Sequence, residues 1–158
     1  MEWMTLISTL SGGALGVGST LAVEALRARR DRGHHQAELQ RTACVRYLTA
    51  LTETETALQT LALSGSTPVA NAKVVEAFRS QQLLAAHYEL FLVAPPSVYS
   101  AAREAYNRLR AIRVAIATTD VVVGDDSAAW QAIHVPYDDA FRQLRVVMRE
   151  LLSPGLRL

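Results

Sequence analysis

A histidine and two aspartates in the last third of the chain come closest to the residue types and spacing of a metal site. His134, Asp138 and Asp139 combine an imidazole with carboxylates, and His134 and Asp138 are four residues apart. Residues at this spacing share one face of a helix, provided that the kink expected at Pro136 permits it. Imidazole and carboxylate groups both bind divalent cations. His134 and Asp138 are therefore weak metal candidates, and the alternative is an ordinary polar edge of a helix.

The wider pattern predicts that the protein has no metal centre, no cofactor and no enzymatic activity. Carboxylate-bridged di-iron bundles need Glu-x-x-His pairs on two helices, and this chain contains no Glu-x-x-His. His34 and His35 with Glu38 would bind at most a stray divalent ion. The phosphate-binding, dinucleotide-binding and serine-nucleophile motifs of common enzymes are absent from the sequence.

Two further reactive side chains lie on an apolar stripe. Glu55 interrupts this stripe, where an unpaired carboxylate would be costly. We expect a facing arginine, Arg108, Arg113 or Arg145, to pair with it and to fix the register of the helices, with a ligand-sensing role as the alternative. Cys44, the one cysteine, lies on the same stripe and is predicted to be a buried, inert thiol.

The elements that must position these residues are four amphipathic helices. Residues recur at spacings of three and four along four segments, as on the buried face of a helix. The stripes are Cys44, Leu48, Leu51, Glu55, Leu58 and Ala62; Val74, Phe78, Gln81, Ala85, Tyr88 and Leu92; Val98, Ala102, Ala105, Leu109, Ile112, Ile116 and Thr119; and Trp130, Ile133, Tyr137, Ala140, Leu144, Val147 and Leu151. Turns at 64–66, 94–96 and 124–127 separate them. An all-α fold with an antiparallel four-helix bundle follows, in which the second helix begins at Thr67-Pro68.

An uncharged segment precedes these helices. Residues 3–23 hold no charged residue, and a helix of about 20 residues crosses the ~30 Å hydrocarbon core of a bilayer. We predict a transmembrane helix at 1–26, an Arg-rich juxtamembrane segment at 27–33, a cytoplasmic helical bundle at 34–153 and a tail at 154–158. Gly33 is the expected bend between the span and the bundle. The segment also holds four Gly, three Ser and three Thr, so a soluble oligomer with a buried N-terminal helix is the alternative.

A basic cluster follows the uncharged segment. Arg27, Arg29, Arg30 and Arg32 with Asp31 give this short stretch a charge of +3. The positive-inside rule then places the bundle in the cytoplasm and the N-terminus outside the cell membrane. We expect these arginines to contact anionic lipid headgroups. Aromatic residues that would stack on bases are not interleaved with them, which argues against a nucleic-acid partner.

Small residues recur along one face of the predicted span. Ser8, Gly12, Gly16 and Thr20 are four apart, and Gly12 and Gly16 form a G-x-x-x-G motif. Small residues let two helices approach closely in lipid, where close packing drives association. The pattern favours pairing of two spans, hence a homo-oligomer. The alternative is a span with small residues that does not pair.

Composition narrows the class of protein without naming an activity. The chain has 158 residues, of which 50% are hydrophobic, and a net charge of +1. This composition excludes a mainly disordered chain and argues against a globally basic nucleic-acid binder. A length of 158 residues suits one domain with a modest core, and one cysteine excludes an intrachain disulfide.

Loose motifs along nearly the whole chain carry a resemblance to a family. They comprise an Arg-rich stretch after a Gly-rich span, a helix with a central tyrosine, an Ala-Pro-Pro turn and a closing Tyr-x-x-Ala-Phe helix. The matching residues are Arg29, Arg30, Tyr47, Ala94, Pro95, Pro96, Val98, Tyr137, Ala140, Phe141, Met148, Arg149 and Leu152. In this order of features the chain resembles a broad set of uncharacterised, single-pass membrane-anchored helical-bundle proteins of high-GC Gram-positive bacteria. The resemblance implies an architecture and no activity.

The leading interpretation is a non-enzymatic, membrane-anchored helical interaction or scaffold protein that self-associates and binds an unknown protein partner. A second hypothesis is a ligand- or metal-binding bundle, a sensor or an enzyme, that uses His134, Asp138 and Glu55. A third is a soluble helical oligomer that buries its N-terminal helix between subunits.

Overall fold

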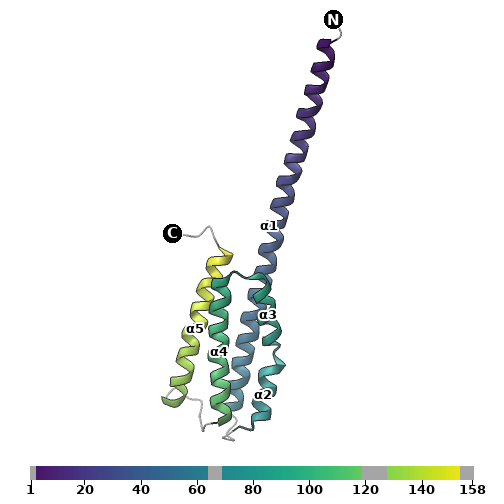
Figure 1. Cartoon of the computed structure of the whole chain (residues 1–158). Helices are drawn as coiled ribbons and strands as arrows, with labels where there is room; N and C mark the ends of the chain where they lie inside the picture. Colours follow the sequence, from purple (N-terminus) through teal and green to yellow (C-terminus); the bar gives the residue numbers. More distant parts are fainter. Residues whose placement is uncertain (1–2, 64–68, 119–127, 154–158) are drawn as a thin grey trace. The chain divides into compact units, whose positions relative to one another are not determined.

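The fold is all-helical, as predicted. The computed structural model describes residues 3–63, 69–118 and 128–153. Within them lie five helices and no strand: α1 (Trp3–Leu63), α2 (Asn71–Ser80), α3 (Leu83–Val93), α4 (Pro96–Thr118) and α5 (Ala128–Leu152) (Figure 1). The chain divides into two compact units, Met1–Glu38 and Leu39–Leu158, which are described separately below.

The first unit consists of the N-terminal part of α1, which is helical from residue 3 and continues without a break through Gly33. Its described side chains are those of Arg27 and of residues 29–38, and all of them are exposed. Among the helices whose side chains are described, none combines the length and the apolar character that a membrane crossing requires. The predicted span at 3–23 and the small-residue face from Ser8 to Thr20 lie outside these described side chains.

The second unit is a helical bundle, as predicted. The C-terminal part of α1, the pair α2 and α3, then α4 and α5 form four columns (Figure 1). Gln40 of α1 donates a hydrogen bond to the carbonyl of Val93 at 2.8 Å, and Arg46 pairs with Glu89 at 2.8 Å. From the first contact to the second, the residue number increases on α1, from Gln40 to Arg46, and decreases at the partner, from Val93 to Glu89. The two helices are therefore antiparallel.

The core of the bundle is formed by the buried stripe of each helix. Leu109, Ile112, Trp130 and Leu144, which the spacing places in the core, are all buried. The predicted stripes on α1, α4 and α5 lie in or against this core, apart from Glu55, which is half-buried, and Thr119, which is outside the described residues. The largest fully buried side chains are Tyr47, Leu51, Leu58, Val74, Leu83, Leu90, Leu109, Ile112, Ile116, Tyr137, Leu144 and Met148.

The predicted second helix is wrong in its second half, because it is broken between α2 and α3. Gln82 adopts a left-handed conformation with φ of 52°, and α3 starts afresh at Leu83. An uninterrupted stripe would carry Gln81 into the core, where its amide would lack partners. The break shifts the register, so that Leu83 and Leu90 are buried while Tyr88 and Leu92, predicted to be core residues, are exposed.

The start of α2 also differs from the prediction. The helix begins at Asn71, after the extended residue Ala70, which provides no side-chain cap. The predicted start at Thr67-Pro68 and the predicted turns at 64–66 and 124–127 lie outside the described residues. α5 continues through Pro136, whose ring nitrogen has no hydrogen to donate along the helix.

Truncation of Leu144 tests the core assignment. Leu144 is fully buried on α5, so Leu144→Ala should lower the free energy of unfolding by about 2–5 kcal/mol, because it removes buried methyl groups and leaves a cavity. Val114, on the exposed side of α4, supplies the control, and Val114→Ala should change stability by less than about 0.5 kcal/mol. Chemical unfolding of the full chain measures both. Equal unfolding midpoints for Leu144→Ala and the wild type would contradict the assignment.

Candidate functional site

A cluster of four polar side chains joins α1 to α5. Glu55 and Gln59 lie one turn apart on α1, and His134 and Asp138 lie one turn apart on α5. We call these four residues the polar cluster. His134 Nε2 lies 2.8 Å from Glu55 Oε1, and His134 Nδ1 lies 3.3 Å from Asp138 Oδ2. The side chains of Glu55 and His134 are each 16% exposed, and that of Asp138 is 45% exposed. The two ring nitrogens of one histidine therefore face two carboxylates.

Three atoms of the polar cluster form a closed triangle. Gln59 Nε2 lies 3.2 Å from Glu55 Oε1 and 3.2 Å from His134 Nε2, and the third side is the 2.8 Å contact between Glu55 and His134. When His134 Nε2 carries a hydrogen, it and Gln59 Nε2 both donate to Glu55 Oε1, and the side between the two nitrogens joins two donors. When His134 Nε2 carries no hydrogen, it is an acceptor, and the side between it and Glu55 Oε1 joins two acceptors. Hydrogens therefore satisfy at most two of the three sides.

Two aromatic rings border the polar cluster. The Trp130 indole stacks on the His134 imidazole, with ring centroids 4.8 Å apart and planes inclined by 27°. Tyr137 lies on the same side of α5, and its ring centroid is 6.0 Å from that of His134. The Tyr137 hydroxyl is fully buried and, among the described residues, has no hydrogen-bond partner of good geometry. Burial raises the pKa of Tyr137 above its usual value, and the neighbouring Glu55 carboxylate raises it further.

The predicted shared face of His134 and Asp138 is confirmed by their contact, and α5 keeps it despite Pro136. Asp139, the third member of the sequence pattern, instead pairs with Arg142 at 2.9 Å on the exposed side. Glu55 thus completes the cluster from a helix far away in sequence. Residues at similar distances from the end of α1 and from the start of α5 come together, because the two helices are antiparallel. Glu55 and His134 are such a pair, so the sequence contained a signal for this contact.

The arginine partner predicted for Glu55 is wrong. Arg108 pairs with Glu104 on its own helix at 2.7 Å. The guanidinium of Arg113 lies 5.0 Å from the Phe78 ring centroid, and that of Arg145 lies 5.3 Å from the Phe141 ring centroid. These long side chains keep their charged ends at the edge of the bundle. The shorter imidazole of His134 reaches Glu55 from a position closer to the core.

A second polar network surrounds His87, a buried residue that lies on none of the predicted stripes. The Tyr47 hydroxyl donates to the carbonyl of Ala102 at 2.8 Å, and His87 Nδ1 lies 3.3 Å from the same hydroxyl. The His87 ring also contacts the rings of Tyr99 and Tyr106, with centroids 5.3 and 5.1 Å away. Burial lowers the pKa of His87 and raises that of Tyr47. This network ties α1, α3 and α4 together.

The solvent side of α3 is apolar. Four large side chains on this helix are exposed: Leu84, Tyr88, Phe91 and Leu92. We call them the α3 outer face. Tyr88 is 61% exposed and Leu92 is 79% exposed. At 100° per residue the four positions fall within one third of a turn, so they form a continuous strip.

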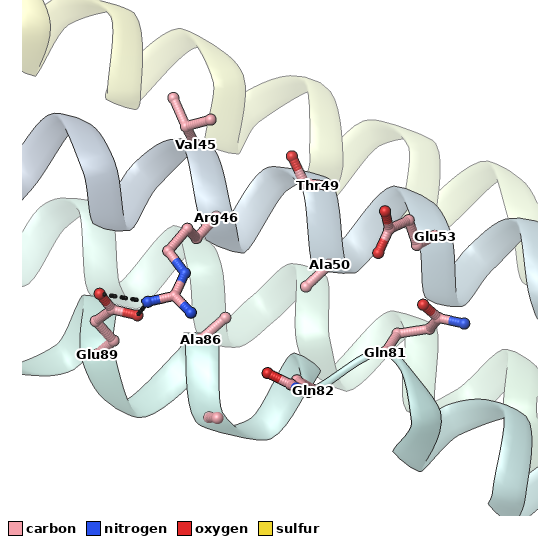
Figure 2. Close-up of a pocket in the computed structure, with 10 residues that line it drawn as sticks. Val45, Arg46, Thr49, Ala50, Glu53, Gln81, Gln82, Ala86 and Glu89 are labelled. Carbon is pink, nitrogen blue, oxygen red and sulfur yellow. Dashed lines mark hydrogen bonds and ion pairs between the residues drawn. The ribbon is translucent and has the colours of Figure 1, made fainter.

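A shallow pocket lies between α1 and the break that separates α2 from α3. It has a volume of about 230 Å³ and is floored by Ala50 and Ala86. Figure 2 shows Arg46 reaching across to Glu89 at one end, with Glu53 and Gln81 at the other. The ion pair at its end is solvent-exposed, and exposed pairs contribute at most about 1 kcal/mol. The pocket therefore has a polar rim without a buried anchor for a ligand.

The other predicted site residues lie on α1. Cys44 is buried, as predicted, and burial raises the pKa of its thiol, which disfavours the reactive thiolate. The four predicted membrane-surface residues, Arg27, Arg29, Arg30 and Arg32, are exposed on α1. The predicted helix-pairing residues, Ser8, Gly12, Gly16 and Thr20, lie outside the described side chains.

A scan against protein-family models and searches of curated proteins and of solved structures found no match to this chain.

Acidification tests the burial of His87. Its folded-state pKa is lowered from 6.5, so the unfolded chain takes up this proton first as the pH falls. The stability that depends on neutral His87 is complete above about pH 6.5 and is lost below it. Unfolding measured between about pH 7.5 and pH 5.5 should show a smaller loss of stability in His87→Gln than in the wild type.

Exposed His35 provides the matched control for this experiment. His35→Gln removes a histidine from solvent and should keep the pH dependence of the wild type. If His87→Gln and the wild type lost stability equally on acidification, the buried placement of His87 would be wrong.

Proposed function

We propose that this protein is a non-enzymatic, single-pass membrane-anchored helical interaction protein that self-associates through the α3 outer face. The bundle lies in the cytoplasm and presents this face to a second copy of the chain. The observation that carries the proposal is the strip of Leu84, Tyr88, Phe91 and Leu92, exposed on an otherwise well-packed helix.

The chemistry of the α3 outer face supports a protein partner. Contiguous exposed apolar patches on monomeric proteins mark interaction sites, and aromatic residues are enriched at the cores of interfaces. Glu89, the one charged residue of α3, is engaged by Arg46 of α1 at 2.8 Å. The outer face thus offers apolar side chains without a charge that docking would have to desolvate.

A second copy is the partner that this face suits best. In a symmetric dimer each copy contributes the same patch, so the patch must complement itself. An uncharged strip meets this condition, because two copies bring no like charges together. The Phe91 and Tyr99 rings, 4.8 Å apart, extend the apolar surface from α3 onto α4.

Membrane attachment is supported by the sequence of the first unit. Residues 3–23 lack charge, and Arg27, Arg29, Arg30 and Arg32 follow on an exposed part of α1. These arginines would meet the cytoplasmic headgroups. Pairing of the spans through Gly12 and Gly16 would hold two bundles together and raise their effective concentration, so that a weak contact between bundles suffices. The resemblance to membrane-anchored helical-bundle proteins agrees with this arrangement.

The membrane orientation predicts where the C-terminus lies. A reporter fused to Leu158 of the full chain should be active in the cytoplasm, because the positive stretch follows the uncharged segment. The protein should sediment with the membrane fraction, and its release into solution should require detergent. An external C-terminus would reverse the orientation, and recovery in the soluble fraction without detergent would favour the soluble oligomer with a buried N-terminal helix.

Charge on the α3 outer face tests self-association. Tyr88→Glu in the full chain should reduce the cross-linked dimer in membranes at least tenfold, because docking would bury an unpaired carboxylate. Val114→Glu is the matched control, since Val114 is exposed on α4 outside this face, and it should leave the dimer unchanged. Equal dimer yields from Tyr88→Glu and the wild type would contradict the proposed surface.

A second pair of variants separates the bundle from the span. Gly16→Ile places a bulky side chain on the small-residue face and should weaken pairing of the span, whereas Val17→Ile, on another side of the helix, should not. If neither Gly16→Ile nor Val17→Ile weakened the dimer, self-association would be assigned to the bundle alone.

A further inference from the structure

We propose that Glu55, Gln59 and His134 form a binding site for a divalent first-row transition-metal cation, best suited to Zn²⁺, in which Asp138 positions the histidine. The site joins α1 to α5, and it is independent of the proposed docking face on α3. The proposal starts from the triangle of polar atoms that Glu55, Gln59 and His134 bring together between α1 and α5.

The two sides of the triangle that meet at Gln59 match the ligand spacing of a tetrahedral ion, and the side between Glu55 and His134 must lengthen by about 0.5 Å. Zinc binds nitrogen and oxygen ligands at about 2.0–2.2 Å, so two ligand atoms of a tetrahedral site lie roughly 3.3 Å apart. The observed sides are 2.8 Å between Glu55 and His134 and 3.2 Å from Gln59 to each of them. The nitrogen and oxygen ends of the Gln59 amide exchange when its terminal bond rotates by 180°. The carbonyl oxygen then occupies the third corner as a ligand.

Asp138 has the position of a residue that orients a metal-binding histidine. His134 Nδ1, the ring nitrogen that does not face Glu55, lies 3.3 Å from Asp138 Oδ2, and ligand atoms of Glu55, His134 and Asp138 all lie within 4.8 Å of one another. A hydrogen on Nδ1 donated to Asp138 leaves Nε2 with its lone pair pointing at the triangle. Carboxylate–histidine–metal arrangements recur in zinc proteins for this reason. Stacking of Trp130 on the imidazole holds the plane of the ring.

The Tyr137 hydroxyl also borders the site. It is fully buried, and its neighbour is the Glu55 carboxylate, which raises the Tyr137 pKa through its charge and a hydrogen bond, although the contact falls short of good hydrogen-bond geometry. A cation held by three protein ligands keeps a water molecule in its fourth position. Such a water would offer a partner to the Tyr137 hydroxyl, the one buried side-chain polar atom of the described residues without a hydrogen bond of good geometry.

The ligand types select among cations. Imidazole favours zinc and its neighbours, whereas magnesium and calcium prefer sites made of oxygen alone. Two carboxylates, from Glu55 and Asp138, balance the charge of a divalent ion. Because Glu55 and His134 are each 16% exposed, the ion can enter from solvent and still be shielded once bound. Bound to both α1 and α5, it would cross-link the bundle.

Zinc titration of the full chain tests the proposal. The chain is stripped with EDTA, the chelator is removed, and Zn²⁺ is added while binding is followed by calorimetry. The double variant His34→Gln/His35→Gln serves as the background, because these two exposed histidines can hold a stray ion. We expect one Zn²⁺ per chain in this background. His134→Gln should lower the affinity at least ~100-fold, and Asp138→Asn should lower it ~10–100-fold, as for residues that position a ligand.

Thermal unfolding provides a readout that separates metal binding from folding. Excess Zn²⁺ should raise the melting temperature of the background chain by roughly 5–10 °C, as a ligand of the folded state does. The melting temperature of Gln59→Leu should be the same with and without Zn²⁺, even if the substitution itself changes the stability of the metal-free chain. Glu53→Gln, which alters an exposed carboxylate outside the cluster, should retain it.

The proposal is overturned if the background chain binds no Zn²⁺, or if His134→Gln binds it with unchanged affinity. Zinc binding that disappears with His34 and His35 would assign the ion to these exposed histidines and would likewise overturn the proposal. A rise in melting temperature that survives Gln59→Leu would remove Gln59 from the ligand set and, with it, the triangle on which the site is built.

Discussion

A buried polar atom needs a partner, and this constraint decides where the bundle departs from a regular pattern. A continuous stripe through the second column would carry Gln81 into the core, and the column is instead broken at Gln82. Tyr47 can occupy the core because its hydroxyl donates to the carbonyl of Ala102 at 2.8 Å. Glu55 can interrupt an apolar stripe because His134 meets it from α5 at 2.8 Å. Tyr47 and Glu55 therefore each fix the position of α1 against another helix.

The spacing of apolar residues predicts the fold where one helix presents one uninterrupted stripe. It identifies the core positions of α4 and α5, including Leu109 and Leu144, because apolar residues spaced three and four apart lie on one face of a regular helix. It fails at Gln82, where a single left-handed residue shifts the register of α3. Nothing in a periodic count marks such a residue, since glutamine rarely adopts this conformation.

The candidate site is predictable in part for a similar reason. His134 and Asp138 share one helix, so their spacing alone brings them together. Glu55 and Gln59 belong to a helix about eighty residues earlier, and their contact with His134 depends on how two helices are aligned. A local pattern can show that Glu55 needs a partner without showing whether that partner is an arginine or a histidine. Tertiary packing made this choice, and it created a cluster of polar side chains from both helices.

The break at Gln82 has a consequence for the dynamics of the bundle. It leaves α2 with ten residues and α3 with eleven, and helices this short are marginal without tertiary contacts. The other three columns are long helical segments, so this column depends most on docking for its structure. Its hydrogen-bonded amides therefore belong to the part of the bundle that opens first, in local unfolding that leaves α4 and α5 paired. Such opening exposes the His87 ring to water and leaves the contact between Glu55 and His134 intact, since that contact is made by α1 and α5.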